Sequence, residues 1–119
     1  MKNHEPTDAE LRALDKLIAT IDVFRVLEPT IPSSYIRLFL QIARSPGKGI
    51  TEYARELGMI GAVASRIYLE IGPKKRGGGE GLNLVESLPD AIDLRQKHLF
   101  LTPKGRHMYA NVIRAMGPS

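Results

Sequence analysis

The chain of 119 residues contains no cysteine. This absence excludes disulfide bonds, thiolate zinc sites, cysteine nucleophiles and thiol redox sensing together. No apolar run approaches the roughly 18 residues that a membrane-spanning helix needs. The polar start Met1–Glu5 leads into no apolar core of a signal peptide. We therefore expect a cytoplasmic protein without a membrane partner.

Catalytic and metal-binding motifs are missing as well. The three histidines, His4, His98 and His107, have no second strong ligand at metal-binding spacing. No Ser-His-Asp signature, paired carboxylate motif or glycine-rich nucleotide fingerprint occurs. The sequence predicts a protein that is not an enzyme and uses no metal or cofactor.

The composition is that of an ordinary globular domain, with 43% hydrophobic and 25% charged residues, and we expect residues 1–119 to form one domain. Residues 1–73 hold nine Lys/Arg and nine Asp/Glu. Residues 74–119 hold eight and four, so the whole net charge of +4 lies in the second part. This distribution fits a polyanionic partner of the C-terminal part.

A helix is predicted over residues 8–27, because Thr7 and Glu10 form a Thr-x-x-Glu capping box before an apolar pattern. The apolar positions at helical spacing are Leu11, Leu14, Ile18 and Ile21, and Leu17, Phe24 and Leu27 widen their face. One small domain does not need a face this wide. It fits either packing on the chain's own core or partial burial against a second copy.

Two shorter helices are expected next. Ser33 or Ser34 can cap the first, which ends where Pro and Gly cluster at residues 45–49. The second spans Ile50–Gly58, with Thr51 as its cap and a terminal glycine suited to a left-handed exit.

The helix predicted over residues 61–71 has two different faces. Its apolar face is expected to comprise Ile60, Ala64, Ile67 and Ile71. The opposite face carries small, hydroxylated and cationic side chains and comprises Ala62, Ser65, Arg66 and Leu69. A short helix, a glycine turn and such a helix make residues 50–71 a candidate helix-turn-helix, whose second helix enters the major groove of DNA. A plain helical hairpin is the alternative interpretation.

A segment rich in lysine and glycine follows this helix. Lys74, Lys75 and Arg76 are adjacent, and glycines dominate up to Gly81. No Walker-type lysine motif occurs. Contact with DNA phosphates or a narrow minor groove is one interpretation, and a solvated surface loop is the other.

Residues 82–102 are predicted to form a hairpin. Strands are expected over 82–86 and 97–101, with a turn region over 87–92. We expect a polar tip carrying Asp93 and Arg95. Such a charged hairpin is the wing of a winged helix-turn-helix, which favours duplex DNA as the partner.

Thr102 is expected to cap a last helix over residues 103–116, with Pro103 in its first turn. The apolar side of this helix comprises Met108, Val112, Ile113 and Met116. The predicted fold is mainly α with a small β-hairpin (α+β), a winged helix-turn-helix with N- and C-terminal dimerisation helices.

Over roughly residues 33–110 these motifs resemble the MarR family of bacterial winged-helix transcription regulators. The segment Asp93-Leu94-Arg95 is similar to the family's Asp-x-Arg wing. The family's Leu-Thr-x-x-Gly helix start is similar to the segment that follows, Leu99-Phe100-Leu101-Thr102-Pro103-Lys104-Gly105-Arg106. Weaker matches are Ile50–Leu57, similar to the family's Thr-x-x-Glu-Leu-Ala helix, and Ala64–Ile67 in the recognition helix.

Three features depart from the family pattern. Residues 73–80 are inserted before Gly81-Leu82, where members pass through a short turn. The recognition helix starts with Ile60-Gly61, where Ser or Thr normally caps it. The chain stops at Ser119, about one helix before the usual dimerisation bundle is complete.

The resemblance implies that Ser65 and Arg66 face the major groove, that Arg95 lies at the minor groove, and that Asp93 orients Arg95. The full set of expected DNA contacts is Ala62, Ser65, Arg66, Leu69, Lys74, Lys75, Arg76, Arg95 and Lys97. The expected dimer contacts are Leu11, Leu14, Ile18, Ile21, Val112, Ile113 and Met116.

The predicted function is that of a homodimeric, sequence-specific regulator of transcription that binds double-stranded DNA and acts as a repressor. A small-molecule effector is possible, but no motif indicates one. The alternative is a winged-helix module for protein interaction or non-specific DNA anchoring in a replication or mobile-element complex. A continuous cationic surface at Arg66, the lysines of the insertion and Arg95 favours the regulator. A dominant apolar patch there favours protein contact.

Overall fold

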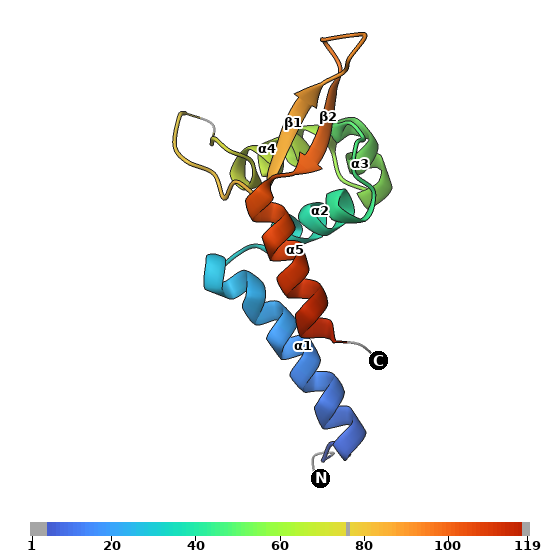
Figure 1. Cartoon of the computed structure of the whole chain (residues 1–119), viewed down its shortest axis with the longest axis vertical. Coiled ribbons are helices and arrows are strands. Elements are labelled where there is room, and N and C mark those ends of the chain that lie inside the picture. Colours follow the sequence, from blue (N-terminus) through green and yellow to red (C-terminus); the bar gives the residue numbers. More distant parts are fainter. Residues whose placement is uncertain (1–4, 76, 118–119) are drawn as a thin grey trace.

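The computed structural model describes residues 5–75 and 77–117. Its elements are α1 (Asp8–Leu27), α2 (Ser33–Arg44), α3 (Ile50–Leu57), α4 (Gly61–Ile71), β1 (Val85–Pro89), β2 (Lys97–Leu101) and α5 (Pro103–Met116). The predicted mainly helical fold with one antiparallel hairpin is confirmed. Figure 1 shows α2, α3, α4 and the hairpin gathered at one end of an elongated molecule of 59 × 30 × 27 Å.

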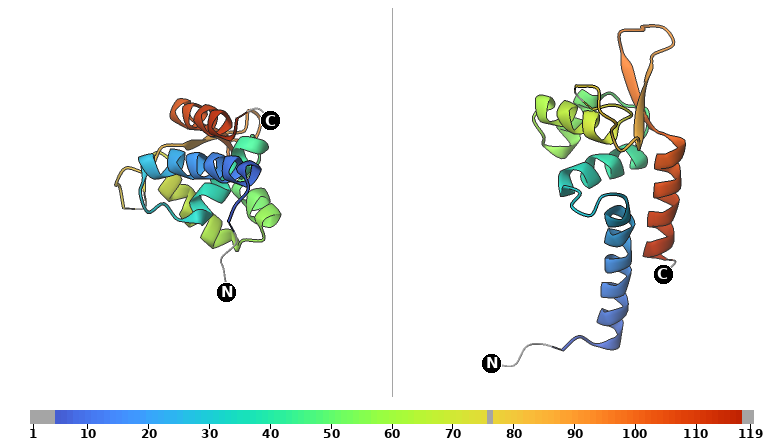
Figure 2. Two further views of the ribbon diagram at one scale, coloured as in Figure 1. Left: turned by 90° about the horizontal axis from the view of Figure 1, so that it is seen from below. Right: turned by 90° about the vertical axis from the view of Figure 1, so that its left-hand side faces the viewer.

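Helices α1 and α5 contact each other and run away from this group, as the right view of Figure 2 shows. Only the C-terminal part of α1 enters the core, where Phe24 meets Phe39 of α2 edge to face at 5.9 Å between ring centroids. The remainder of α1 is exposed. Among the helices in the described part of the chain, none is both long and apolar enough to cross a bilayer.

The core lies between α2, α4, the hairpin and the first half of α5. Its buried apolar side chains are Phe24, Leu38, Phe39, Ile42, Tyr53, Ile67, Ile71, Leu84, Val85, Leu99, Met108 and Val112. The apolar face predicted for α4 is buried at Ala64, Ile67 and Ile71, but Ile60 is 73% exposed because it precedes the first helical turn.

The helix starts agree with the sequence at the two ends of the chain. Thr7 and Glu10 form the predicted capping box of α1, and the Thr102 hydroxyl accepts the Gly105 N–H at 2.9 Å to cap α5. The predicted caps of α2 and α3 are wrong. Pro32 precedes α2, and Gly49 precedes α3, with the Gly49 N–H donating to the Glu52 carboxylate at 3.4 Å.

The first strand begins three residues later than predicted and continues through Pro89. The backbone N–H groups of Leu82, Asn83 and Leu84 donate to carbonyls at the end of α4, those of Glu70, Gly72 and Ile71, at 2.8–2.9 Å. Helix ends leave such carbonyls without partners, so this segment completes α4 instead of extending the hairpin. Asn83 also has a positive φ of 57°, which interrupts an extended run.

The wing pairs Val85 with Leu101 and Pro89 with Lys97. The other side of β2 is also satisfied, because Leu99 exchanges two backbone hydrogen bonds with the loop before α3, at Gly47 and Lys48. Residues 45–49 thus protect the free edge of β2 and tie the wing to the helix-turn-helix.

Candidate nucleic-acid interface

The outer face of α4 is built as the sequence predicts. Ala62, Ser65 and Arg66 are exposed and Leu69 is half-buried, while the opposite face packs into the core. Small side chains at two of these positions allow the helix backbone to approach a surface closely. The arginine supplies donors in the fork geometry that matches guanine edges.

Helix α3 sets the position of α4. Gly58 adopts the left-handed conformation at φ 66°, and the Met59 N–H returns to the Ala54 carbonyl at 2.8 Å. The predicted glycine exit from α3 is therefore confirmed. No side-chain hydrogen bond caps α4 at Ile60, as its sequence suggests, so packing on α2 and α3 holds this helix in place.

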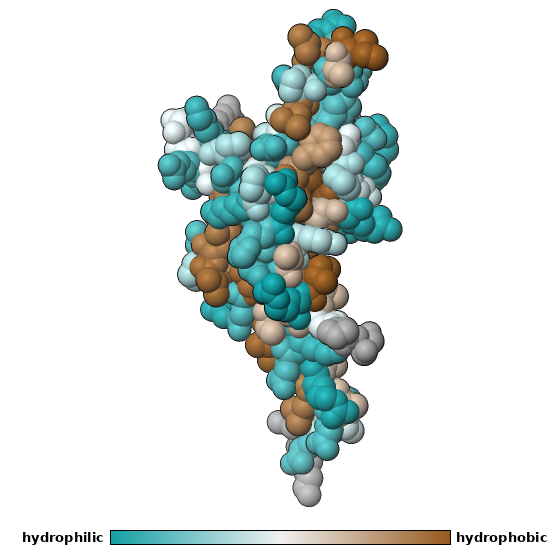
Figure 3. All heavy atoms as spheres, in the orientation of Figure 1, coloured by the Kyte–Doolittle hydropathy of each residue, from teal (hydrophilic) through white to brown (hydrophobic). Residues whose placement is uncertain are grey.

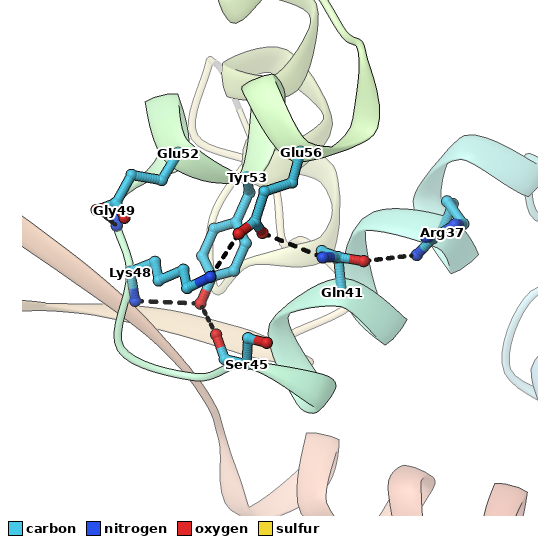
Figure 4. Close-up of polar contacts among 8 residues, drawn as sticks. All are labelled: Arg37, Gln41, Ser45, Lys48, Gly49, Glu52, Tyr53 and Glu56. Atoms are coloured by element: carbon cyan, nitrogen blue, oxygen red, sulfur yellow. Dashed lines mark hydrogen bonds and ion pairs between the residues drawn. The ribbon is translucent and has the colours of Figure 1, made fainter.

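A chain of polar side chains fixes α3 to α2 (Figure 4). Arg37 donates to Gln41, and Gln41 donates to the Glu56 carboxylate, each at 3.0 Å. Glu56 also pairs with the Lys48 ammonium. This pairing lowers the pKa of Glu56, with help from Gln41, and raises the pKa of Lys48.

Tyr53 locks the loop that connects α2 to α3. Its hydroxyl donates to the Ser45 carbonyl at 2.5 Å and accepts the Lys48 N–H at 3.1 Å, as Figure 4 shows. The side chain is fully buried, and burial raises the pKa of its phenol. Sequence reasoning missed this residue, because an aromatic at an apolar helical position gives no sign of its hydroxyl partners.

The wing carries the cations that the sequence predicts. Arg95 lies at the tip with a side chain that is 91% exposed, and Lys97 is exposed at the start of β2. Asp93 accepts from both the backbone N–H and Nε of Arg95, at 3.1 and 3.2 Å. The structure therefore contains the contact through which Asp93 can orient Arg95.

A second carboxylate, Asp90, holds the base of the tip. It accepts the backbone N–H groups of Ile92 and Asp93 at 2.9 Å and contacts His98 Nε2 at 2.8 Å. These contacts, led by the Asp93 N–H, lower the pKa of Asp90 to about 2. His98 Nδ1 lies 3.0 Å from the Gly47 carbonyl, so both ring nitrogens are within hydrogen-bond distance of an oxygen.

The tip is not polar throughout, and that expectation is wrong. Ile92 is 96% exposed and Leu94 is 68% exposed, on either side of Asp93. The turn formed by the two aspartates uses their side chains for internal hydrogen bonds and leaves the intervening apolar side chains facing solvent.

The Lys/Gly-rich insertion is folded in its described part. Lys74 and Glu80 form an antiparallel bridge, and the Lys75 N–H donates to the Gly79 carbonyl. The Lys75 ammonium lies 3.6 Å from a Glu70 oxygen of α4, while Lys74 is exposed. Arg76, the third cation of this segment, lies outside the described residues.

Recognition helix and wing lie at the same end of the molecule, opposite the free ends of α1 and α5 (Figure 1). An open cleft between the start of α3, α4 and β2 is lined by Thr51, Ser65 and Lys97 among others. Within residues 5–75 and 77–117, no group of His, Asp or Glu side chains could hold a metal ion. The exposed cations Arg66, Arg95 and Lys97 at this end suit contact with a polyanion.

Several solved structures with this arrangement are regulators of transcription. The repressor CouR bound to a 23-mer DNA duplex is 27% identical, with a TM-score of 0.54 over 90% of this chain and 66% of that chain. The chain has a MarR-like winged-helix fold. It spans just under two thirds of the length of CouR.

Two further structures show the same fold at lower identity. The transcriptional regulator Tm0710 from Thermotoga maritima is 20% identical, with a TM-score of 0.63 over 91% of this chain and 68% of that one. A MarR protein from Peptoclostridium difficile is 16% identical, with a TM-score of 0.59 over 96% and 74%. Comparisons with protein-family models and with curated protein sequences give no match.

Proposed function

We propose that this MarR-like chain is a homodimeric regulator of transcription that binds double-stranded DNA sequence-specifically and represses the genes beside its site. One observation carries the proposal. The small, cationic face of α4 and the Arg95-bearing wing lie at one end of a fold that the repressor CouR also has, and CouR's structure contains a DNA duplex. This arrangement fits a docking in which α4 lies in the major groove as the recognition helix and the wing lies at the adjacent minor groove.

The dimer part of the proposal rests on exposed apolar side chains. Six of the seven predicted contacts are 44–56% exposed in the single chain, namely Leu11, Leu14, Ile18, Ile21, Ile113 and Met116. The seventh, Val112, is only 4% exposed and packs in the chain's own core. We therefore remove Val112 from the proposed interface and retain the other six.

Binding is tested by fluorescence anisotropy on the chain's own upstream DNA and on a scrambled duplex of equal length. A specific regulator should prefer its own site by about a thousandfold or more. Equal binding to both duplexes with a steep salt dependence would indicate a non-specific anchor. A reporter gene behind that site then separates repression, which lowers expression, from activation, which raises it.

Arg66→Ala tests the role of the recognition helix. Loss of a bidentate base contact should cost about 1–3 kcal/mol on the specific duplex and less on the scrambled one. Arg12→Ala, at an exposed position on α1, is the matched control and should bind as the unchanged protein does. Equal weakening on both duplexes would contradict base reading by Arg66.

The insertion should act through phosphates. Replacing Lys74 and Lys75 by Ala should reduce the slope of log K against log salt by about 1 for each phosphate that the variant no longer neutralises, with little change in sequence preference. An unchanged slope would make this segment a surface loop without a role in binding.

Ile18→Glu tests the dimer. A charge placed in a buried apolar interface is costly, so sedimentation should show a monomer at concentrations where the unchanged protein is dimeric. Ala9→Glu adds the same charge to the opposite face of α1 and should leave the dimer intact. A dimeric Ile18→Glu variant would refute this interface.

A further inference from the structure

The end of the wing exposes more apolar surface than a solvated turn needs. Ile92 and Leu94 are 96% and 68% exposed. The space-filling view of Figure 3 shows hydrophobic surface at the end of the wing. Leu88, in the strand below them, is 46% exposed. Nothing else in the described chain covers this end of the hairpin.

The exposed side chains are held on a structured turn. The Asp90 N–H donates to the Gln96 carbonyl and the Gln96 N–H to the Asp93 carbonyl, at 2.9 and 3.0 Å. The Asp90 carboxylate accepts two further N–H groups and contacts His98, which in turn is tied to the loop before α3. Ile92 and Leu94 are therefore presented by a turn that is ordered before any partner arrives, which lowers the entropy cost of binding.

The tip presents an exposed guanidinium beside its apolar side chains. Arg95 Nε donates to the Asp93 carboxylate at 3.2 Å, and the Arg95 side chain is still 91% exposed. A partner that approaches the tip meets two branched apolar side chains beside a guanidinium. Arginine is attracted to the negative potential of a narrow minor groove.

The size of the patch argues against a protein partner. A stable protein interface buries about 800 Å² on each side, and the tip offers two side chains at the end of a two-stranded ribbon. The minor groove is about 6 Å wide, so it admits single side chains that project from the tip of a hairpin. Isoleucine and leucine are among the side chains that proteins insert between base steps there.

We propose that Ile92 and Leu94 form an apolar wedge that enters the minor groove of the bound duplex and partly unstacks one base step. The inference rests on the proposed function, because it assigns a role to the wing of a DNA-bound protein. Insertion kinks the duplex, and pyrimidine–purine steps such as TA are the easiest to deform. The wing then reads sequence through DNA flexibility, in addition to any base contacts of α4.

The test measures binding and bending separately. A 30-bp duplex from the chain's own upstream DNA carries a donor and an acceptor fluorophore at its ends, so that energy transfer reports the bend, and anisotropy reports affinity. Ile92→Ser with Leu94→Ser removes the wedge at two exposed positions, where folding should not suffer. Ile92→Leu with Leu94→Ile preserves apolar volume and serves as the matched control.

We expect the unchanged protein and the Leu/Ile control to bend the duplex, and the double Ser variant to bind about tenfold more weakly without the added bend. A 2-aminopurine placed at the contacted step should brighten only with the first two proteins. Equal bending by the Ser variant would overturn the wedge. A Ser variant that binds and bends DNA as the unchanged protein does, but no longer regulates a reporter gene, would also overturn the wedge. That result would assign the tip to a protein partner.

Failure of the proposed function gives a different result. In that case the unchanged protein binds neither its upstream duplex nor a scrambled one, and the energy transfer stays at the value of free DNA for every variant. Binding by the unchanged protein without bending leaves the DNA-binding function in place and refutes the wedge alone.

Discussion

Gly105→Ala is expected to destabilise the protein strongly, although alanine is the better helix former. Gly105 lies in the first turn of α5, where this helix crosses the segment before β1. A Cβ atom added there would lie 1.9 Å from the Leu84 carbonyl oxygen and 3.3 Å from Leu101 Cβ. Real Cβ atoms essentially never come within 3.0 Å of such an atom, so the two backbones must separate by about 1.1 Å, the difference between 3.0 and 1.9 Å.

The magnitude follows from three contributions. Overpacking costs about 1–3 kcal/mol, and the upper end applies because the clash is with backbone that cannot rotate away. The Leu84 carbonyl also accepts the Thr102 N–H at 3.0 Å, and weakening that bond costs about 1 kcal/mol. Alanine returns about 1 kcal/mol of helix propensity. The net loss is about 3 kcal/mol, a large share of the stability of a small domain.

The assay is urea unfolding followed by circular dichroism at one protein concentration, since association would shift the midpoint. Gly61→Ala is the control, because its added Cβ meets nothing within 4 Å. Its stability should stay equal or rise by up to about 1 kcal/mol. If the free energy of unfolding of Gly105→Ala lies within about 0.5 kcal/mol of that of the unchanged protein, the prediction is refuted. The close approach of α5 to the Leu84 carbonyl would then not explain the glycine in the Leu-Thr-x-x-Gly pattern.

Two further predictions concern side chains that sequence reasoning missed. Tyr53→Phe leaves the Ser45 carbonyl and the Lys48 N–H without their partner, so urea unfolding should show a free energy of unfolding that is lower by about 1–3 kcal/mol. The control is Tyr109→Phe at a 43% exposed position, which should lower it by less than about 0.5 kcal/mol. The pKa of Asp90 is lowered from 3.8 to about 2, so its contribution to stability is complete above pH 3.8 and is lost as the pH falls through 2. Asp90→Asn should therefore be less stable than the unchanged protein at pH 6 and should lose less stability between pH 4 and pH 2. A parallel pH dependence of the two proteins would contradict this role.

The sequence predicted the helices well because their signals are local. The capping box of α1, the Gly58 exit from α3 and the Thr102 start of α5 each depend on residues a few positions apart. The boundary of β1 could not be predicted in this way. Leu82 and Asn83 alternate like strand residues, yet their N–H groups pair with the end of α4, a partner that only the folded chain supplies.

The candidate site divides in the same manner. The exposed face of α4 and the cations of the wing follow from helical periodicity and from the hairpin, so Ser65, Arg66 and Arg95 could be named in advance. The apolar end of the wing could not. The mixture of acidic and apolar residues over 90–94 leaves open which side chains turn inward. The internal hydrogen bonds of Asp90 and Asp93 decide that Ile92 and Leu94 face solvent.

The sequence by itself determined the order of the elements, the excess of positive charge in residues 74–119 and the resemblance of the wing to one family, because each depends on residue type and short spacing. The tertiary structure alone decided which side chains meet. His98 contacts the carbonyl of Gly47, 51 residues earlier, and Val112 is buried while its neighbour Ile113 remains exposed. Such pairings depend on how α2, β2 and α5 pack together, and packing over long separations leaves no local pattern in the sequence.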